Sequence, residues 1–567
     1  MTRSIDRRKF LGTAVLSGAA IAALGNQTVL GQEATPAPEA SPAAGGDAAS
    51  GFELNGLAPT ATPLGDVVPP EVADPANWAA ENIDLSNTRA YLGSTISSAN
   101  IDQLGPSWSF AYNAANSFGA VTSQTAIVGD ILYTQDTQSN VFALDKTTGE
   151  LLWSKEYNEA ITSGGPCGVT VGYGVAVFAV GNGGVAAIDA LTGEDKWQIS
   201  LTGDRGEGIS MTPGIYNSTV YISTVPGGTN EFYNGGQRGF LYALDISSGR
   251  VLWYFDTTTD NLWGNPRANS GGGLWHPPAF DADGNIYIDV ANPAPWPGNE
   301  TYPAGSSRPG ENLYTDSIVR LNKDTAGVDW YLKAKDYDLF DLDNQLSPVL
   351  AEVDGKLVVF ASGKHGYVVA ADANTGKQLW KTAVGKHQND EITPDQIPDD
   401  DQDPIEVFPG SLGGVETNLA YADGVVYAPL LNASGMYTKS AIAGGATPLS
   451  EATGQLVALN AATGEILWDV TFPSPQLAAA TVVNDLVFTA GLDGVVRALA
   501  TADGSEVWTY QATAGVNAPL AFNGDTLYVA AGGPLMASTD TASPAPALAP
   551  QLTALTLGAM AEATPES

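Results

Sequence analysis

One phrase recurs along the chain and constrains its fold more than any other feature. In each copy, alternating apolar residues lead into a turn, and a second alternating run then carries a tryptophan, as in ALDKTTGELLW. Six of the seven copies place a glycine four residues before the tryptophan, where a hairpin turn needs a positive φ. The pattern therefore predicts β-hairpins. The seven copies end at Trp153, Trp197, Trp253, Trp330, Trp380, Trp468 and Trp508.

An eighth tryptophan, Trp108, follows NIDQLGPSW without the turn. This is expected if an N-terminal strand completes the last sheet and closes a ring. Most intervals between the eight tryptophans match the roughly 40–50 residues of a four-stranded propeller blade, and two intervals hold inserts. The sequence therefore predicts an all-β fold, with residues 74–535 forming one eight-bladed β-propeller and a tryptophan docked between each pair of blades.

The two ends of the chain differ from this body. Residues 4–12 read SIDRRKFLG, and an uncharged stretch of small and apolar residues follows from Leu11 to Gly25. This is typical of a twin-arginine export signal, which we assign to 1–31. The alternative, a transmembrane anchor, needs a longer apolar stretch. Residues 32–73 and 536–567 are rich in alanine and proline, and we expect them to be a disordered linker and a disordered tail.

Charge and cysteine content exclude several functions. Lysine and arginine total 24 against 62 for aspartate and glutamate, a net charge of −38. A nucleic-acid-binding surface and docking to anionic lipid are therefore excluded. Cys167 is the only cysteine, so no intrachain disulfide and no cysteine-based zinc site can form. No apolar run in the body is long enough to span a bilayer, and we expect a periplasmic, secreted or cell-surface protein.

Four motifs follow one another in and just after the interval between Trp253 and Trp330. They read SGGGLW, ANPAPW, RPGENLYT and YDLFDLD. In order and spacing they resemble the quinoprotein alcohol dehydrogenases, eight-bladed propellers that hold pyrroloquinoline quinone (PQQ) at the ring axis. The resemblance extends from about residue 92 to residue 533. It also covers the repeat, although non-catalytic propellers such as the outer-membrane assembly lipoprotein carry the same repeat.

The resemblance implies a role for individual residues. Trp275 would be the floor on which the quinone lies, and Lys364 would hydrogen-bond its oxygens. Asp341 would be the catalytic base, and the preceding Phe340 replaces the tryptophan of the family. On a strand, residues i and i+2 face the same side, so Asp343 could reach the same ion as Asp341. The implied ligands of a Ca²⁺ or lanthanide ion are Asn292, Asp341, Asp343 and Glu231.

Two departures from the family pattern concern the cofactor lid and the metal. The adjacent cysteines of the family are reduced to Cys167, and Asn234 stands where a metal-binding glutamate is expected, with Glu231 three residues earlier. Our first hypothesis is an exported oxidoreductase that oxidises a small alcohol and passes electrons to a separate acceptor, a cytochrome c or a quinone. The alternative is a non-catalytic propeller that binds protein or polysaccharide outside the cytoplasm.

Overall fold

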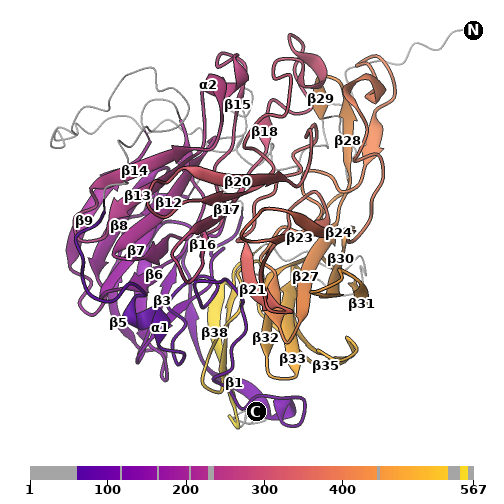
Figure 1. Ribbon diagram of the computed structural model, residues 1–567. Coiled ribbons are helices and arrows are strands. Elements are labelled where there is room, and N and C mark those ends of the chain that lie inside the picture. The colour runs from indigo at the N-terminus through magenta and orange to yellow at the C-terminus, as the bar shows by residue number, and fades with distance from the viewer. Residues whose placement is uncertain are drawn as a thin grey trace, which may run out of the picture.

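The structure confirms the prediction of an eight-bladed β-propeller. The computed structural model describes residues 60–114, 118–161, 165–202, 206–227, 235–442, 447–533 and 549–559. Within these residues, eight antiparallel sheets of four or five strands are arranged round a central axis (Figure 1). We number them blades 1–8 in chain order.

Blades 1–4 follow one another along the chain. Blade 1 contains β2 (Ala126–Val128), β3 (Ile131–Gln135), β4 (Val141–Asp145) and β5 (Leu151–Lys155). Blade 2 contains β6 (Thr170–Gly172), β7 (Val175–Val180), β8 (Gly184–Asp189) and β9 (Asp195–Ser200). Blade 3 contains β10 (Gly208–Ile209), β11 (Gly214–Tyr216), β12 (Thr219–Val225), β13 (Phe240–Asp245) and β14 (Val251–Asp256). Blade 4 contains β16 (Ala279–Phe280), β17 (Ile286–Val290), β19 (Ser317–Leu321) and β20 (Val328–Lys333).

Blades 5–8 complete the ring. Blade 5 contains β21 (Val349–Val353), β22 (Lys356–Ala361), β23 (Tyr367–Asp372) and β24 (Gln378–Ala383). Blade 6 contains β26 (Ala420–Ala422), β27 (Val425–Asn432), β30 (Thr453–Asn460) and β31 (Ile466–Phe472). Blade 7 contains β32 (Gln476–Val483), β33 (Leu486–Gly491), β34 (Val495–Ala500) and β35 (Glu506–Gln511). Blade 8 contains β36 (Ala521–Asn523), β37 (Thr526–Ala531), β38 (Gln551–Leu557) and β1 (Leu104–Ala111).

The remaining elements lie in the connections. A short ladder joins β15 (Ser270–Gly271) to β18 (Pro293–Ala294), and a small sheet contains β25 (Ile405–Val407), β28 (Gly435–Thr438) and β29 (Ala441–Ile442). Both lie at the upper end of the ring in Figure 1. The helices are one turn long: α1 (Pro70–Ala73), α2 (Asp260–Trp263), and 3-10 turns at Ile101–Gln103, Pro303–Gly305 and Pro394–Gln396.

Blade 8 closes the ring with strands from both ends of the chain. β1, which carries Trp108, pairs antiparallel with β38. The expectation that an N-terminal strand completes the last sheet is therefore confirmed. The expectation of a disordered tail over 536–567 is wrong for β38, whose alternating QLTALTL pairs with strands on both sides. Residues 60–73, assigned to the disordered linker, are also ordered, since the Glu71 carboxylate accepts hydrogen bonds from the Tyr173 and Gly174 amides. The assigned export signal lies outside the described residues.

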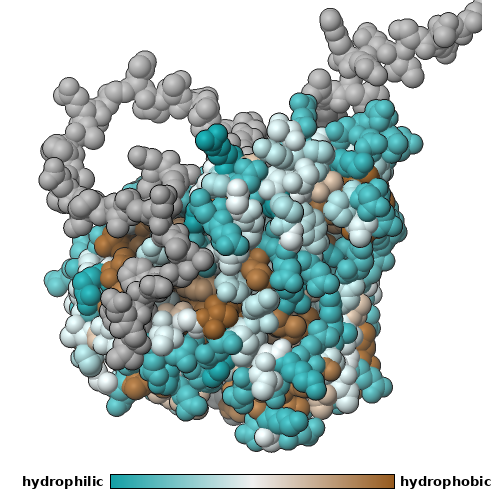
Figure 2. Space-filling model, turned by 45° about the horizontal axis from the view of Figure 1, so that its top comes forward, coloured by the Kyte–Doolittle hydropathy of each residue, from teal (hydrophilic) through white to brown (hydrophobic). Residues whose placement is uncertain are grey.

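Burial within a blade follows the sequence pattern. The second strand of blade 2, VAVFAV in β7, is buried at every position, whereas the outermost strand, DKWQIS in β9, alternates between exposed and half-buried. A continuous apolar run is expected for a strand covered on both faces by neighbouring blades, and alternation is expected for an edge that meets water. The face shown in Figure 2 is largely hydrophilic, in keeping with the net charge of −38.

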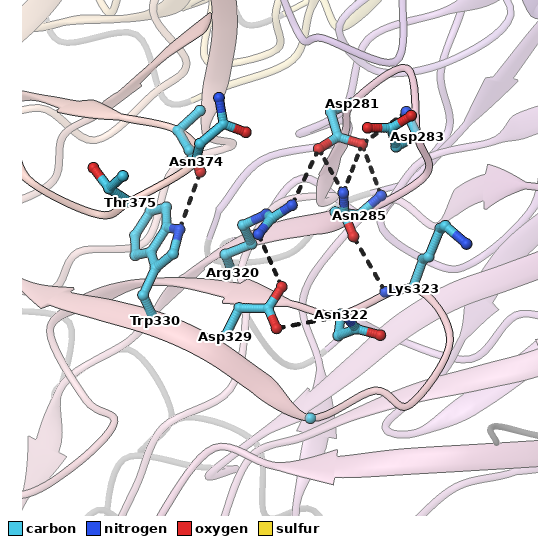
Figure 3. A network of polar contacts seen from close by, with 12 residues as sticks. Asp281, Asp283, Asn285, Arg320, Asn322, Lys323, Asp329, Trp330, Asn374 and Thr375 are labelled. Carbon is cyan, nitrogen blue, oxygen red and sulfur yellow. Dashed lines mark hydrogen bonds and ion pairs between the residues drawn. The ribbon is translucent and has the colours of Figure 1, made fainter. Parts of the chain in front are cut away.

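Most of the tryptophans of the repeat dock against the next blade. The Trp108 indole donates to the Lys146 carbonyl at 3.1 Å, and the indoles of Trp197, Trp330, Trp380 and Trp468 make the same contact with the following blade. Figure 3 shows the Trp330 copy, in which Arg320 also bridges Asp281 and Asp329 beside the docked ring. The turn glycine of the following blade lies against the indole ring, and its lack of a side chain makes room for the ring.

This contact predicts a difference between two glycines of blade 1. A Cβ on Gly149 would lie 2.5 Å from the Trp108 ring, whereas a Cβ on Gly129 meets nothing within 4 Å, and both residues have positive φ. We expect Gly149→Ala to lower the free energy of unfolding by about 1–3 kcal/mol more than Gly129→Ala, because it adds overpacking to the same backbone strain. Urea unfolding of both variants measures this difference, and equal losses would contradict the docking role.

Residues 77–91, which we call the N-terminal strap, cross from blade to blade. Backbone hydrogen bonds join the strap to blade 1 at Ile127, blade 2 at Val171, blade 4 at Phe280, blade 5 at Leu350, blade 6 at Tyr421 and blade 7 at Val482. The buried Arg89 guanidinium donates to the Leu520 carbonyl at the entrance to blade 8. The strap therefore ties seven blades together next to their inner strands. No helix among the described residues is long and apolar enough to cross a membrane.

Candidate functional site

The candidate site is built on loops at one end of blades 4, 5 and 6. The segment before each inner strand carries Trp275 (before β16), Asp341 and Asp343 (before β21), and the GGVETN segment (before β26). Two further loops, between the second and third strands of blades 4 and 5, carry Asn292 and Lys364. Because successive inner strands enter side by side round the axis, residues far apart in sequence meet here.

Lys364 lies between the two predicted acids. Its Nζ is 3.0 Å from Asp341 Oδ2 and 2.7 Å from Asp343 Oδ2. Both acids are buried, and the Asn292 backbone N–H donates to Asp343 Oδ1 at 2.9 Å. The structure therefore brings together four of the six residues named from the sequence. The structure also shows that Lys364 forms ion pairs with the two acids themselves, a contact that the sequence did not indicate.

The two acids converge for a reason other than the one expected. Residues 341–346 are irregular, so the expectation that Asp341 and Asp343 share one face of a strand is wrong. Asp341 instead has a φ of 65°, in the left-handed region, which turns the chain between the two aspartates. Such strained backbone in a non-glycine residue is concentrated at functional sites.

Two glycines allow the three loops to stack closely. A Cβ on Gly363 would lie 1.9 Å from the Asp343 carbonyl oxygen, and one on Gly414 would lie 2.1 Å from the Lys364 carbonyl oxygen. Any other residue at either position would push the loops apart. The stack is completed by a hydrogen bond from the Val415 amide to the Gly363 carbonyl at 3.0 Å. The spacing of Lys364 from the two acids thus depends on backbone contact as well as on charge.

The electrostatics of this cluster suit proton transfer. Burial raises the pKa of Asp341 well above its ordinary value, against the opposing effect of Lys364. Burial disfavours the charge on Lys364, but Asp341 and Asp343 outweigh it and raise the lysine pKa well above its usual range. Lys364 is therefore a fixed cation, and Asp341 is a carboxyl group whose proton affinity is increased. A general base with a raised pKa accepts a proton more readily.

Glu416 is a functional candidate that the sequence did not single out. Its Oε2 accepts a hydrogen bond from the Gln345 amide at 3.3 Å, while its Oε1 is buried and has no hydrogen-bond partner among the described residues. Burial raises its pKa to about 7. Its only sequence signal is its place in the GGVETN segment, residues 413–418, to which we assign no role from the sequence alone.

Trp275 lies on a loop held against the Asn292 loop. β15 pairs with β18, and the Ala291 amide donates to the Gly273 carbonyl at 2.9 Å. Trp275 itself is half-buried. An indole that is partly open, on a loop fixed on both sides, can offer a flat apolar surface to a ring system.

Unpaired polar atoms lie just before the inner strand of blade 1. The Ser123 hydroxyl, the Gln124 amide and the Thr125 hydroxyl are buried and have no hydrogen-bond partner among the described residues. Ser123 packs beside Gly168 of blade 2, which in turn lies beside Thr212 of blade 3. Buried donors without partners are uncommon in proteins and are expected where a polar ligand binds. Isolated serine, threonine and glutamine residues form no motif, so sequence reasoning missed them.

Comparison with known proteins places these features in a family. A family model described as "Glucose/ethanol/alcohol dehydrogenase, beta-propeller domain" matches residues 204–404. A second, described as "Outer membrane protein assembly factor BamB", matches residues 90–288 and 432–546, more than half of the chain. The chain belongs to the PQQ-dependent alcohol dehydrogenase-like family of β-propellers.

Relatives within this family cover most of the chain. The quinohemoprotein alcohol dehydrogenase ADH-IIG of Pseudomonas putida is 27% identical over 80% of this chain and 71% of its own. The polyvinylalcohol dehydrogenase of a Pseudomonas species is 25% identical over 79% of this chain and 70% of its own. The solved structure of ADH-IIG from P. putida HK5 superposes with a TM-score of 0.74 at 22% identity, covering 88% of this chain and 82% of that one. A europium-containing methanol dehydrogenase has a TM-score of 0.70 at 19% identity, covering 86% and 99%.

This protein departs from the family pattern at the cysteine pair and at the metal-binding glutamate. Cys167 is buried and reduced, and burial raises its thiol pKa to about 12, so it is unsuited to redox chemistry. Glu231 and Asn234 lie outside the described residues, and the expectation that Glu231 binds a metal stays a prediction. Among the described residues, no three histidine, cysteine, aspartate or glutamate side chains come together in a group that could hold a metal ion.

Proposed function

We propose that this protein is a quinoprotein oxidoreductase that oxidises a small alcohol. The observation that carries the proposal is the buried cluster of Asp341, Asp343 and Lys364 beside the Asn292 and Trp275 loops, in a chain of the PQQ family. When bound, PQQ would supply the hydride acceptor. The residues present fit such a group, because half-buried Trp275 offers a flat surface and Ser123, Gln124 and Thr125 offer unpaired donors to its carboxylates.

The chain's own residues divide the work of alcohol oxidation. Asp341 would take the hydroxyl proton of the alcohol at its carboxylate, and the bound cofactor would be the acceptor of the hydride. Lys364, which the two acids hold as a cation, would hydrogen-bond the cofactor and offset negative charge on it. Asn292 holds Asp343 through its backbone N–H, and Asp343 in turn holds Lys364.

A Ca²⁺ or lanthanide ion would bind at the two acids. Asp341 Oδ2 and Asp343 Oδ2 both lie within 3.0 Å of the Lys364 ammonium, so the two carboxylates can approach one cation, and hard cations prefer such oxygens. The side chains of Asn292 and Glu231 are the other proposed ligands. A trivalent ion suits two carboxylates together with the acids of the cofactor better than a divalent one does.

The role of Asp343 gives a testable metal preference. We expect Asp343→Ala to remove most of the preference for La³⁺ over Ca²⁺, because a site that loses one carboxylate gains less from the third charge of the ion. Titrations of the purified variant and the wild type with both ions, followed by tryptophan fluorescence, give the two affinity ratios. An unchanged ratio would show that Asp343 is not a ligand.

Reconstitution tests the proposed activity. Purified protein is incubated with PQQ and either Ca²⁺ or La³⁺, and dye-linked oxidation of a panel of primary and secondary alcohols is then followed. Turnover that requires both PQQ and the metal ion supports the proposal. The dye would replace the natural acceptor, which we propose is a separate cytochrome c or quinone. We also propose that the protein lies outside the cytoplasm, as the export signal predicted for residues 1–31 implies.

A second candidate is a non-catalytic propeller that binds protein or polysaccharide with its ring face. The observation that favours it is Cys167, which is a single buried thiol where the family has adjacent cysteines over the cofactor. A folded propeller that takes up no PQQ in the presence of either ion would support this candidate.

A further inference from the structure

The strap inserts two polar side chains among the loops of the candidate site. Besides the backbone hydrogen bonds of the strap to the blades, the buried side chains of Glu81 and Asn82 point at neighbouring loops. Glu81 Oε1 lies 2.6 Å from His276 Nδ1 and accepts a hydrogen bond from the Asn418 amide, also at 2.6 Å. Because a carboxylate only accepts, His276 is the donor in the first contact.

These contacts reach all three loops that enter the inner strands at the site. His276 directly follows Trp275, so Glu81 fixes the loop that carries the candidate floor. Asn418 lies two residues after Glu416, so Glu81 also fixes the GGVETN segment. Asn82 donates a hydrogen bond to the Ser347 hydroxyl at 2.9 Å. Ser347 lies at the end of the loop that carries Asp341 and Asp343.

The three loops are also bonded to one another round this centre. The Ser347 amide donates to Asn418 Oδ1 at 3.0 Å, and the Ser347 hydroxyl donates to the Pro277 carbonyl at 2.9 Å. Arg89 supports the strap from behind by donating to the Glu81 carbonyl at 2.8 Å. Glu81 Oε2 is buried without a hydrogen-bond partner among the described residues.

We propose that Glu81 is a positioning residue for the candidate site. It holds the loops of Trp275 and of Glu416 directly, and the loop of Asp341 and Asp343 through Asn418. The inference rests on the proposed function for its effect on cofactor binding, but its structural part does not. Sites of this kind depend on supporting hydrogen bonds that fix the residues in contact with the ligand.

Hydrogen exchange of the full-length protein without cofactor tests the structural part. We expect Glu81→Ala to speed amide exchange about tenfold or more in residues 273–277, 343–348 and 415–419 together. Glu81→Gln should stay close to wild type, because its amide oxygen can accept from both His276 and Asn418. The matched control is Asn77→Ala, which also removes two strap hydrogen bonds but touches only Glu71 and Gly129. It should affect exchange near residue 129 and not in the three loops.

The outcomes separate this inference from the proposed function. If the three loops are as protected in Glu81→Ala as in Asn77→Ala, Glu81 is not a positioning residue. If Glu81→Ala does not fold, His276→Leu removes one link alone and should loosen only residues 273–277; no change there would also overturn the inference. PQQ titration then tests the consequence, with an expected loss of affinity of about tenfold in Glu81→Ala. Failure of the wild type to bind PQQ would refute the proposed function and leave the exchange result to decide on Glu81.

Discussion

Asp341→Asn is expected to reduce kcat for alcohol oxidation by roughly 10²–10⁴-fold, the usual contribution of a general base. An amide cannot accept the hydroxyl proton, although it preserves the volume of the side chain. Affinity for PQQ should change little, since Trp275 and the unpaired donors near blade 1 are untouched. Steady-state kinetics of the reconstituted variant, with PQQ content measured on the same sample, test this prediction.

The control for Asp341 is Asp336, an exposed aspartate in the same acidic run. Asp336→Asn removes a charge of the same sign from the same run, so it corrects for any general electrostatic effect, and its kcat should match wild type. An Asp341→Asn protein that turns over at the wild-type rate would remove this residue from the mechanism.

Lys364→Met should have the largest effect on stability in this region. It leaves Asp341 and Asp343 buried together without a cation, and breaking a buried pair in this way costs about 3–5 kcal/mol. If the two acids form a metal site, Ca²⁺ or La³⁺ should restore much of this loss, because the ion replaces the missing charge. Urea unfolding with and without each ion measures both effects.

Lys323→Met provides the comparison for Lys364. Lys323 forms an exposed ion pair with Asp324, so its loss should change stability little, and metal should have no effect on it. If Lys364→Met is destabilised but gains nothing from either ion, the two acids serve only as ion-pair partners of Lys364, and the metal would have to bind elsewhere.

The architecture could be predicted from the sequence because one local pattern carries it. The turn glycine and the tryptophan are four residues apart in sequence, and they mark the same two positions in six of the eight blades. What the sequence could not show is how the chain ends join the ring. β38 is a single strand in a region rich in alanine and proline, and it gains stability only between β1 and β37. The strap has no regular secondary structure, so no periodicity marks it.

The sequence predicted the residues of the candidate site better than it predicted their geometry. Motif order indicated Asn292, Asp341, Asp343 and Lys364, and the structure brings these four together. The expected strand geometry for the two acids was wrong, because Asp341 has a positive φ and its segment is irregular. The close packing of this loop at Gly363, and of the Lys364 loop at Gly414, has no sequence pattern that would reveal it. Glu81 and His276 could not be paired from the sequence, since 195 residues separate them and no motif joins the two positions.

Direct titration with PQQ tests the central claim that this ring holds a quinone at its axis. The purified full-length protein, supplied with La³⁺ or Ca²⁺, is titrated while quinone absorbance and tryptophan fluorescence are recorded, with Trp275→Ala measured in parallel. The account predicts saturable binding of one PQQ per chain in the wild type and a loss of affinity of at least tenfold in Trp275→Ala. Absence of saturable binding under either ion, or equal affinity in both proteins, would contradict it.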